Sequence, residues 1–165
     1  MVSQLEEKFG IMGKKGYQGE RDVFDEFLIP FYGKNSVKDH TRDRNKQTQG
    51  IDFSITKPDW KRWYTLDVKS NLVKFGGDWI FWLEVESFSK FGNLKPGWFR
   101  HSKADRIYHY CRGGKCCVYY DLNQMQQRID ELGLINRVVE VNNDYLIKIY
   151  ANDSRFQDLF QWLYI

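Results

Sequence analysis

Two runs of alternating residues joined by a proline-containing turn constrain the fold of this chain more than any other feature of its sequence. Residues 50–55 read Gly-Ile-Asp-Phe-Ser-Ile, and residues 62–69 read Arg-Trp-Tyr-Thr-Leu-Asp-Val-Lys. Between them, residues 57–60 read Lys-Pro-Asp-Trp, which is the composition of a turn. Two β-rich runs on either side of such a turn predict a β-hairpin.

Alternation divides the side chains of this hairpin between two faces, and the expected register sets Asp52 opposite Thr65. One face carries Asp52, Ser54, Trp63, Thr65, Asp67 and Lys69. The other face is almost entirely apolar and carries Ile51, Phe53, Ile55, Tyr64, Leu66 and Val68. Asp67 then lies one diagonal step from Asp52, so we expect the two carboxylates to converge beside Lys69.

Two converging acids with a neighbouring amine can bind a divalent cation and act on a phosphodiester. The alternative is an amphipathic hairpin whose solvent-exposed face carries acids and a lysine without a functional role. For an Asp-x-Lys triplet alone that alternative is the more frequent explanation, because short motifs often match by chance.

A third acid favours the functional interpretation. Residues 17–28 have the apolar spacing of a helix that Pro30 should end, and Glu20 lies on the same stripe as Val23 and Phe27. A charge on a core-facing stripe is costly without a partner, and a metal or a lysine would supply one. Glu20 lies in the first turn, however, where a carboxylate also complements the helix dipole and can remain solvated.

The series Glu20, Gly-Ile-Asp52 and Asp67-Val-Lys69 resembles the PD-(D/E)XK nuclease superfamily. In this sequence Gly50-Ile51 stands where the superfamily's nominal pattern has a proline. The resemblance implies a helix packed on a mixed four-stranded sheet with further helices behind it. It covers the span from Glu20 to Lys69 within a catalytic core of about residues 17–120.

The resemblance also implies a role for each matching residue. Asp52 and Asp67 would be metal ligands, helped by the backbone carbonyl of Val68. Lys69 would lie beside the scissile phosphate and assist the attacking water, and Glu20 would orient that lysine or water, or touch a second metal. The implied metal is Mg²⁺, with Mn²⁺ as a substitute, because hard oxygen ligands suit these cations.

Composition limits the class of protein. The chain has 165 residues, of which 42% are hydrophobic and 17% aromatic, so it is not a disordered chain and can form one domain over residues 1–165. Its three cysteines do not make a disulfide framework. No signal peptide and no apolar run of membrane length is recognised. We therefore expect a cytoplasmic protein with no membrane partner, in the host cytoplasm if it is phage-encoded.

The net charge of +3 is small, but its basic residues cluster before Asp52, at the hairpin turn and after residue 100. Such clusters are typical of a phosphate-backbone binder, although each alone is more often a solvated face. The expected nucleic-acid contacts are Lys46, Gln47, Gln49, Arg100, Ser102 and Lys103. Loop surface and simple helix capping are the alternatives for these residues. A zinc site at His101, His109, Cys111 and Cys116 is disfavoured because paired C-x₂-C spacing is missing.

The remaining pattern predicts an α/β or α+β domain with a mixed central sheet flanked by helices, restriction-endonuclease-like. Strands are expected over 37–41, 78–86, 116–120, 138–141 and 145–150. Loops are expected over 42–49 and 87–98. Helices are expected from Ser102 through Tyr110, stopped by Gly113-Gly114, from Asp121 to Leu132, and from Asp153 or Ser154 onward.

The sequence therefore predicts a Mg²⁺-dependent endonuclease that hydrolyses DNA. A phage or mobile-element origin would suit so compact a chain, by analogy only. A homodimer is one expectation, since cutting both strands of a duplex needs two sites. The alternatives are a non-catalytic nucleic-acid-binding module that keeps the fold and an RNA-directed nuclease.

Overall fold

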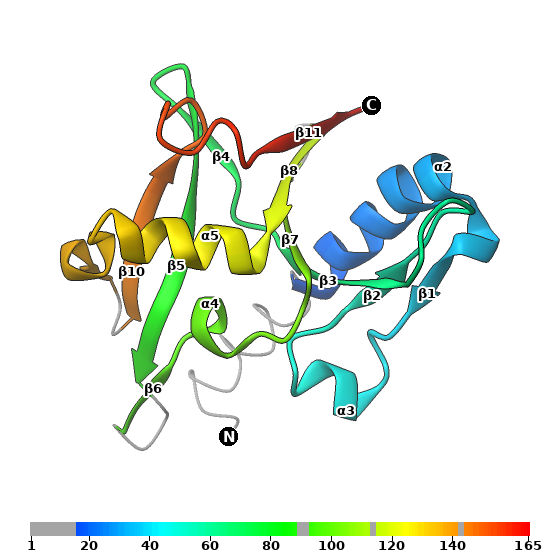
Figure 1. Ribbon diagram of the computed structural model, residues 1–165, viewed down its shortest axis with the longest axis horizontal. Coiled ribbons are helices and arrows are strands. Elements are labelled where there is room, and N and C mark those ends of the chain that lie inside the picture. The colour runs from blue at the N-terminus through cyan, green and yellow to red at the C-terminus, as the bar shows by residue number, and fades with distance from the viewer. Residues whose placement is uncertain (1–15, 89–92, 113–114, 142–143) are drawn as a thin grey trace, which may run out of the picture.

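Two β-sheets dominate the computed structural model, which describes residues 16–88, 93–112, 115–141 and 144–165 (Figure 1). The first sheet has the strand order β1 (Val37–Asp39), β2 (Phe53–Ile55), β3 (Tyr64–Lys69), β7 (Arg106–Cys111), β8 (Cys116–Asp121) and β11 (Gln161–Tyr164). The second has the order β4 (Val73–Phe75), β5 (Asp78–Phe88), β10 (Asp144–Tyr150) and β9 (Val139–Val141), with β6 (Leu94–Pro96) also paired to β5. The expected α+β class with a mixed sheet is confirmed.

Helices are few and mostly short. The chain is helical from residue 16 to Tyr32, passing through a π-helical segment η1 (Phe24–Leu28) into α2 (Ile29–Tyr32). The others are α3 (Arg44–Gln47), α4 (Trp98–His101) and α5 (Leu122–Glu131), with 3₁₀ turns η2 (Lys34–Ser36) and η3 (Leu134–Arg137). No helix in the described part of the chain is long and apolar enough to cross a membrane.

The first sheet is mixed because β3 and β7 run parallel, pairing Leu66 with Arg106 and Lys69 with His109. Its other neighbouring strands are antiparallel. Parallel strands need a long crossover, usually a helix. Here residues 70–105 make the crossover and contain β4, β5, β6 and α4. The connection between the two parallel strands therefore supplies much of the second sheet.

Each face of the first sheet is covered by a separate apolar core. One core lies between this sheet and the N-terminal helix and includes Val23, Phe27, Leu66 and Tyr108. The other core lies between the first sheet, the second sheet and α5, and its members include Phe81, Ile107, Val118, Met125 and Ile147. Because both faces are covered, β7 and β8 are buried along most of their length.

The expected hairpin is present, with a longer loop than predicted. Phe53 pairs with Leu66 and Ser54 with Thr65, so the register differs by two residues from the one that set Asp52 opposite Thr65. A shift by two keeps every side chain on its expected face, whereas a shift by one would reverse the faces. Ile51 is the exception, because it packs in the core on the opposite side from Phe53.

The helix expected from Ser102 through Tyr110 is wrong, because Arg106–Cys111 forms β7. Ile107 belongs to one core, while Tyr108 and Tyr110 belong to the other, which is the period of a strand buried on two sides. Continuous apolar runs of this length fit a buried helix and a buried strand equally well, so tertiary context decides. Gly113-Gly114, expected to stop this helix, lies outside the described residues.

Three other expectations are also corrected. Pro30 does not end the first helix, because it follows the wider η1 turn and lies at the start of α2, where a missing N–H is tolerated. The loop expected over 42–49 contains α3, with the side chain of Asp43 as its N-cap. The loop expected over 87–98 contains β6 and the start of α4.

The terminal helix expected from Asp153 or Ser154 is wrong as well, because residues 154–159 form turns that lead into β11. In contrast, β5, β8 and the β9–β10 hairpin are confirmed. The helix expected from Asp121 is confirmed as α5: Asp121 accepts the N–H of Gln124, and Gly133 follows in a left-handed conformation with φ 62°.

Gly19 allows the N-terminal helix to approach the end of β3 closely. A Cβ atom at Gly19 would lie 1.7 Å from Ser70 Oγ and 2.9 Å from Ser70 Cβ, closer than non-bonded atoms come. Ser70 directly follows β3, and Glu20 is the next residue of the helix. The missing side chain at Gly19 therefore brings Glu20 beside the end of β3.

We predict that Gly19→Ala lowers the free energy of unfolding by about 1–3 kcal/mol, because the new methyl group forces the helix away from Ser70. Ser70→Gly should restore much of that loss in the double variant, since it removes the clashing atoms. Chemical denaturation of the four proteins measures the coupling. Gly16→Ala is the matched control, because a Cβ there meets nothing within 4 Å. Equal effects of the two alanines would contradict the close approach.

Candidate active site

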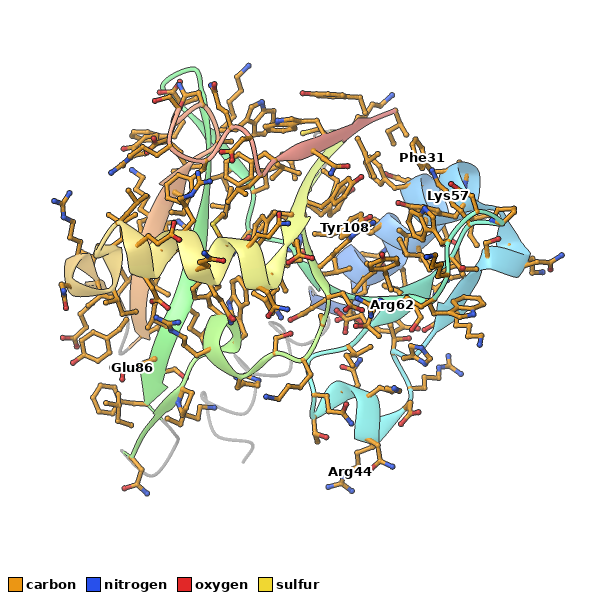
Figure 2. The ribbon with its side chains drawn as sticks, viewed as in Figure 1. Phe31, Arg44, Lys57, Arg62, Glu86 and Tyr108 are labelled. Carbon is orange, nitrogen blue, oxygen red and sulfur yellow. The ribbon has the colours of Figure 1, made fainter. Side chains whose placement is uncertain are left out.

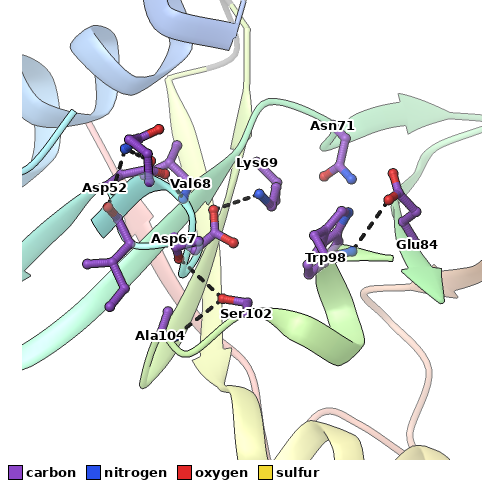
Figure 3. Close-up of polar contacts among 12 residues, drawn as sticks. Asp52, Asp67, Val68, Lys69, Asn71, Glu84, Trp98, Ser102 and Ala104 are labelled. Atoms are coloured by element: carbon purple, nitrogen blue, oxygen red, sulfur yellow. Dashed lines mark hydrogen bonds and ion pairs between the residues drawn. The ribbon is translucent and has the colours of Figure 1, made fainter. Parts of the chain in front are cut away.

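Asp67 and Lys69 lie at the C-terminal end of β3 and point into the space between the two sheets (Figure 3). Lys69 Nζ contacts Asp67 Oδ1 at 2.6 Å. The Asp67 side chain is almost completely buried, and its Oδ2 has no hydrogen-bond partner among the described residues. Burial is the main cause that raises the pKa of Asp67 to about 7, against the lowering effect of Lys69. A buried carboxylate oxygen without a partner is unusual, and a water, a bound ion or a shared proton would satisfy it.

Asp52 precedes β2 and is held in place by two hydrogen bonds. Its Oδ2 accepts the backbone N–H of Val68 at 2.7 Å, and its Oδ1 accepts Gln47 Nε2 at 2.9 Å. The backbone N–H of Asp52 donates to Leu66 at 2.8 Å. Asp52 therefore lies level with Leu66–Val68 of β3, close enough for its charge to raise the pKa of Asp67.

Glu20 reaches the same cluster from the N-terminal helix. Its partial burial, followed by the charge of Asp52, raises the pKa of Glu20 to about 7. Lys69 acts in the opposite direction on this carboxyl. The structure thus brings together the four residues expected to be catalytic: Glu20, Asp52, Asp67 and Lys69.

Lys69 also faces residues that the sequence analysis missed. Its Nζ lies 5.1 Å from the centroid of the Trp98 ring in α4, within the range of a cation–π contact. The backbone N–H of Trp98 lies 3.4 Å from a carboxylate oxygen of Glu84 in β5. Burial disfavours the charged amine, but Asp67 and Asp52 outweigh it and raise the pKa of Lys69. The amine therefore stays protonated near neutral pH.

A buried network of hydrogen bonds centred on His109 connects the segment that follows β3 to the neighbouring strands. His109 is fully buried, and burial lowers the pKa of its ring well below the ordinary value, so the ring is neutral. His109 Nδ1 donates to Asn71 Oδ1 at 2.5 Å, and Nε2 accepts the hydroxyl of Tyr120 at 2.9 Å. Asn71 Nδ2 donates in turn to the carbonyl of Trp82 at 2.9 Å. The network joins the segment after Lys69 to β7, β8 and β5.

These supporting residues could be found from sequence only in part. His109 was considered as a zinc ligand, but both of its ring nitrogens are engaged by Asn71 and Tyr120. The places of Glu84 and Trp98 beside Lys69 could not be read from the sequence, because their contacts depend on the crossover that brings β5 and α4 back to β3.

The residues expected to contact nucleic acid divide into two groups. The carbonyl of Lys46 accepts the N–H of Ile51 at 3.0 Å and that of Gln49 accepts the N–H of Lys103 at 2.7 Å, so Lys46, Gln49 and Lys103 lie beside the segment that leads to Asp52. The side chains of Gln49 and Lys103 are exposed. Gln47 instead donates to Asp52, so its amide positions a carboxylate.

Arg100 and Ser102 are engaged elsewhere. Arg100 forms a surface ion pair with Asp130 of α5 at 2.7 Å. Ser102 is buried and donates its hydroxyl to the carbonyl of Gly50 at 3.2 Å. Ser102 follows α4 and does not begin a helix, so the alternative of helix capping is wrong for it, and no helix N-terminus presents it to a phosphate. Gly50, with φ 67°, is close-packed there, because a Cβ would lie 2.9 Å from Ser102 Oγ.

The donor atoms of this site fit a hard divalent cation such as Mg²⁺. Asp67 Oδ2 is buried and unpartnered among the described residues, and the other carboxylate nearby is that of Asp52, whose oxygens accept the Val68 N–H and the Gln47 amide. Among the described residues no group of three or more His, Cys, Asp or Glu side chains is arranged to hold an ion. Any cation would therefore depend on two carboxylates with backbone and solvent oxygens, and it would compete with Lys69 for Asp67.

Comparison with known proteins gives one distant match. No protein-family model and no solved structure matches the chain. The chain is similar to a 5-formaminoimidazole-4-carboxamide-1-(beta)-D-ribofuranosyl 5'-monophosphate synthetase from Methanosphaera stadtmanae, with 27% identity over 150 residues. The match covers 84% of this chain and 40% of the synthetase. At this identity and coverage the match does not place the chain in a family.

The raised pKa of Asp67 predicts a pH-dependent stability in metal-free protein. Folding favours the protonated acid, so its contribution is complete below the ordinary pKa of 3.8 and is lost as pH rises through about 7. Asp67→Asn does not ionise. Its melting temperature relative to wild type should therefore increase from pH 5 to pH 8, measured in EDTA by circular dichroism.

Asp59→Asn is the control for this measurement, because Asp59 is an exposed acid in the hairpin loop. Its melting temperature should follow that of wild type at each pH. A difference between Asp67→Asn and wild type that stays constant from pH 5 to pH 8 would contradict the raised pKa of Asp67.

Proposed function

We propose that this protein is a Mg²⁺-dependent endonuclease that hydrolyses phosphodiester bonds of DNA, with a restriction-endonuclease-like arrangement of its catalytic residues. The observation that carries the proposal is the buried, unpartnered Asp67 Oδ2 among Asp52, Glu20 and Lys69. Burying Asp52 and Asp67, with Glu20 partly buried beside them, costs free energy that one lysine only partly offsets and that a bound cation would reduce. The same four residues carry the resemblance to the PD-(D/E)XK nucleases.

Each residue has a distinct part in the proposed reaction. Asp52 and Asp67 would hold the cation, and the hydrogen bonds from Gln47 and Val68 fix the first of them. The protonated Lys69 would donate to a phosphate oxygen and stabilise the charge that develops there. Glu20, whose pKa is about 7, would accept a proton from the attacking water near neutral pH.

A bound Mg²⁺ would polarise the phosphoryl oxygen and lower the pKa of a coordinated water. The chain must also hold the side chain of Lys69 in one position. The ring of Trp98 limits its movement on one side of the amine, and the ion pair with Asp67 holds it on the other. The exposed side chains of Lys103 and Gln49, beside the segment that leads to Asp52, would contact the phosphate backbone without reading bases.

We predict that Asp67→Asn reduces cleavage at least about a hundredfold, because it removes a cation ligand while preserving the shape of the side chain. The measurement is cleavage of labelled duplex, single-stranded, four-way-junction and RNA substrates with Mg²⁺, Mn²⁺ or EDTA. Asp130→Asn, which changes an acid outside the site, is the matched control. Equal cleavage by Asp67→Asn and wild type would contradict the proposed role of Asp67.

Lys69 can be tested separately from the cation. Lys69→Met keeps the length of the side chain and removes its charge, so we expect a loss of about 10²–10⁴ in rate. Cation binding should be retained or tighter, because Asp67 Oδ1 loses its competitor. Titration of Mn²⁺ by electron paramagnetic resonance measures this binding. Full turnover by Lys69→Met would exclude Lys69 from catalysis.

Other functions are outcomes of the same experiments. Cleavage confined to RNA would make the protein an RNA-directed nuclease, and binding without cleavage would make it a non-catalytic module. The distant synthetase, whose name contains a ribofuranosyl 5'-monophosphate, suggests a second candidate, a site that binds a nucleoside phosphate. Thermal shift with nucleoside phosphates and Mg²⁺ tests that candidate. A homodimer, proposed because duplex cutting needs two sites, is tested by sedimentation.

A further inference from the structure

The outer face of the second sheet carries aromatic rings gathered around one lysine. The rings of Phe75, Trp82 and Tyr150 lie with their centroids 5.5, 5.7 and 4.8 Å from Lys148 Nζ. These residues come from three adjacent strands, β4, β5 and β10, in which Lys148 pairs with Trp82. We refer to Phe75, Trp82, Lys148 and Tyr150 as the Lys148 platform.

Alternation along the strands explains why this platform faces outward. Phe81 and Leu83 of β5, and Ile147 and Ile149 of β10, belong to the core between the sheets. Side chains at the intervening positions point to the other face. Phe75 is 68% exposed and Tyr150 is 40% exposed, and none of the platform residues belongs to either core of the described chain.

The platform is continuous with the candidate active site. Trp82 accepts a hydrogen bond at its carbonyl from Asn71, which follows Lys69 by two residues. Glu84 lies two positions beyond Trp82 on the same face of β5 and contacts the backbone of Trp98, whose ring lies over Lys69 (Figure 3). These contacts link the end of β3, around the edge of β5, to the face of β5 that carries Trp82.

We propose that the Lys148 platform binds unpaired bases of the nucleic acid that enters the candidate active site. Exposed rings around a cation are the chemistry that single-strand binders use, because every base has a π-face and each phosphate is negative. In a duplex the base faces are already stacked. The substrate class is therefore a nucleic acid with an unpaired segment next to the scissile bond, and this inference rests on the proposed nuclease function.

A similar cation–aromatic contact elsewhere supplies a matched control. Phe31 is 56% exposed, and Lys57 Nζ lies 5.1 Å from its ring. Phe31 and Lys57 lie beside the end of α2, well apart from β5 (Figure 2). This pair resembles the platform in chemistry but is not continuous with Lys69, so its removal should leave binding unchanged.

The test is fluorescence anisotropy in EDTA with a labelled single strand and with a blunt duplex of the same sequence. Phe75→Ala should weaken binding of the single strand about tenfold and leave duplex binding unchanged. Phe75→Tyr should restore it, and Phe31→Ala should match wild type. Phe75 is so exposed that folding should be unaffected, and melting curves verify this.

A second variant tests the cation independently. Lys148→Gln should reduce the slope of log affinity for the single strand against log salt by about 0.7, the value for one phosphate contact. An unchanged slope, or equal losses for single strand and duplex, overturns the proposal. A wild-type dimer that Phe75→Asp converts to a monomer in sedimentation overturns it too, because a second copy would then cover this face.

Binding in EDTA separates failure of this inference from failure of the nuclease. Asp67→Asn should keep single-strand binding while losing cleavage. Suppose that neither wild type nor any variant cleaves a substrate, but Phe75→Ala still weakens single-strand binding. The platform proposal is then supported and the catalytic proposal fails. If cleavage depends on Asp67 but the Phe75 variants bind like wild type, the platform fails alone.

Discussion

The parallel pairing of β3 with β7 is the constraint on which the rest of the structure depends. A parallel pair has to be joined by a crossover, and this chain builds that crossover from strands and the short helix α4. The crossover covers one face of the first sheet while the N-terminal helix covers the other. As a result the polar end of β3 is enclosed on both sides, and its acids are removed from water.

Enclosure gives the site its electrostatic character. Asp67 on an open hairpin and Glu20 on an isolated helix would be ordinary acids, but burial beside Asp52 raises the pKa of each to about 7. Lys69 counteracts this only in part, and it remains charged because two carboxylates surround it. Such a cluster weakens the metal-free fold, and a divalent cation would relieve the repulsion between its carboxylates.

Support for the site comes from residues that do not belong to the sequence motif. Gln47 fixes one carboxylate, and Trp98 limits the positions of the lysine. The neutral ring of His109 joins Asn71 to Tyr120 and so connects the end of β3 with its neighbours. Gly19 contributes because it has no side chain: a Cβ atom there would clash with Ser70 and hold Glu20 away from the cluster.

The sequence alone determined which side chains share a face of the β2–β3 hairpin, with the exception of Ile51, because a period of two survives a register change of two residues. It also determined α5, since Asp121 and Gly133 mark its ends by local hydrogen bonding and backbone conformation. Only tertiary structure decided that residues 106–111 form a strand, that the chain ends in β11, and that Trp98 and Asn71 meet the site. These depend on contacts between distant segments, and a local pattern of apolar residues carries no information about which partner will cover it.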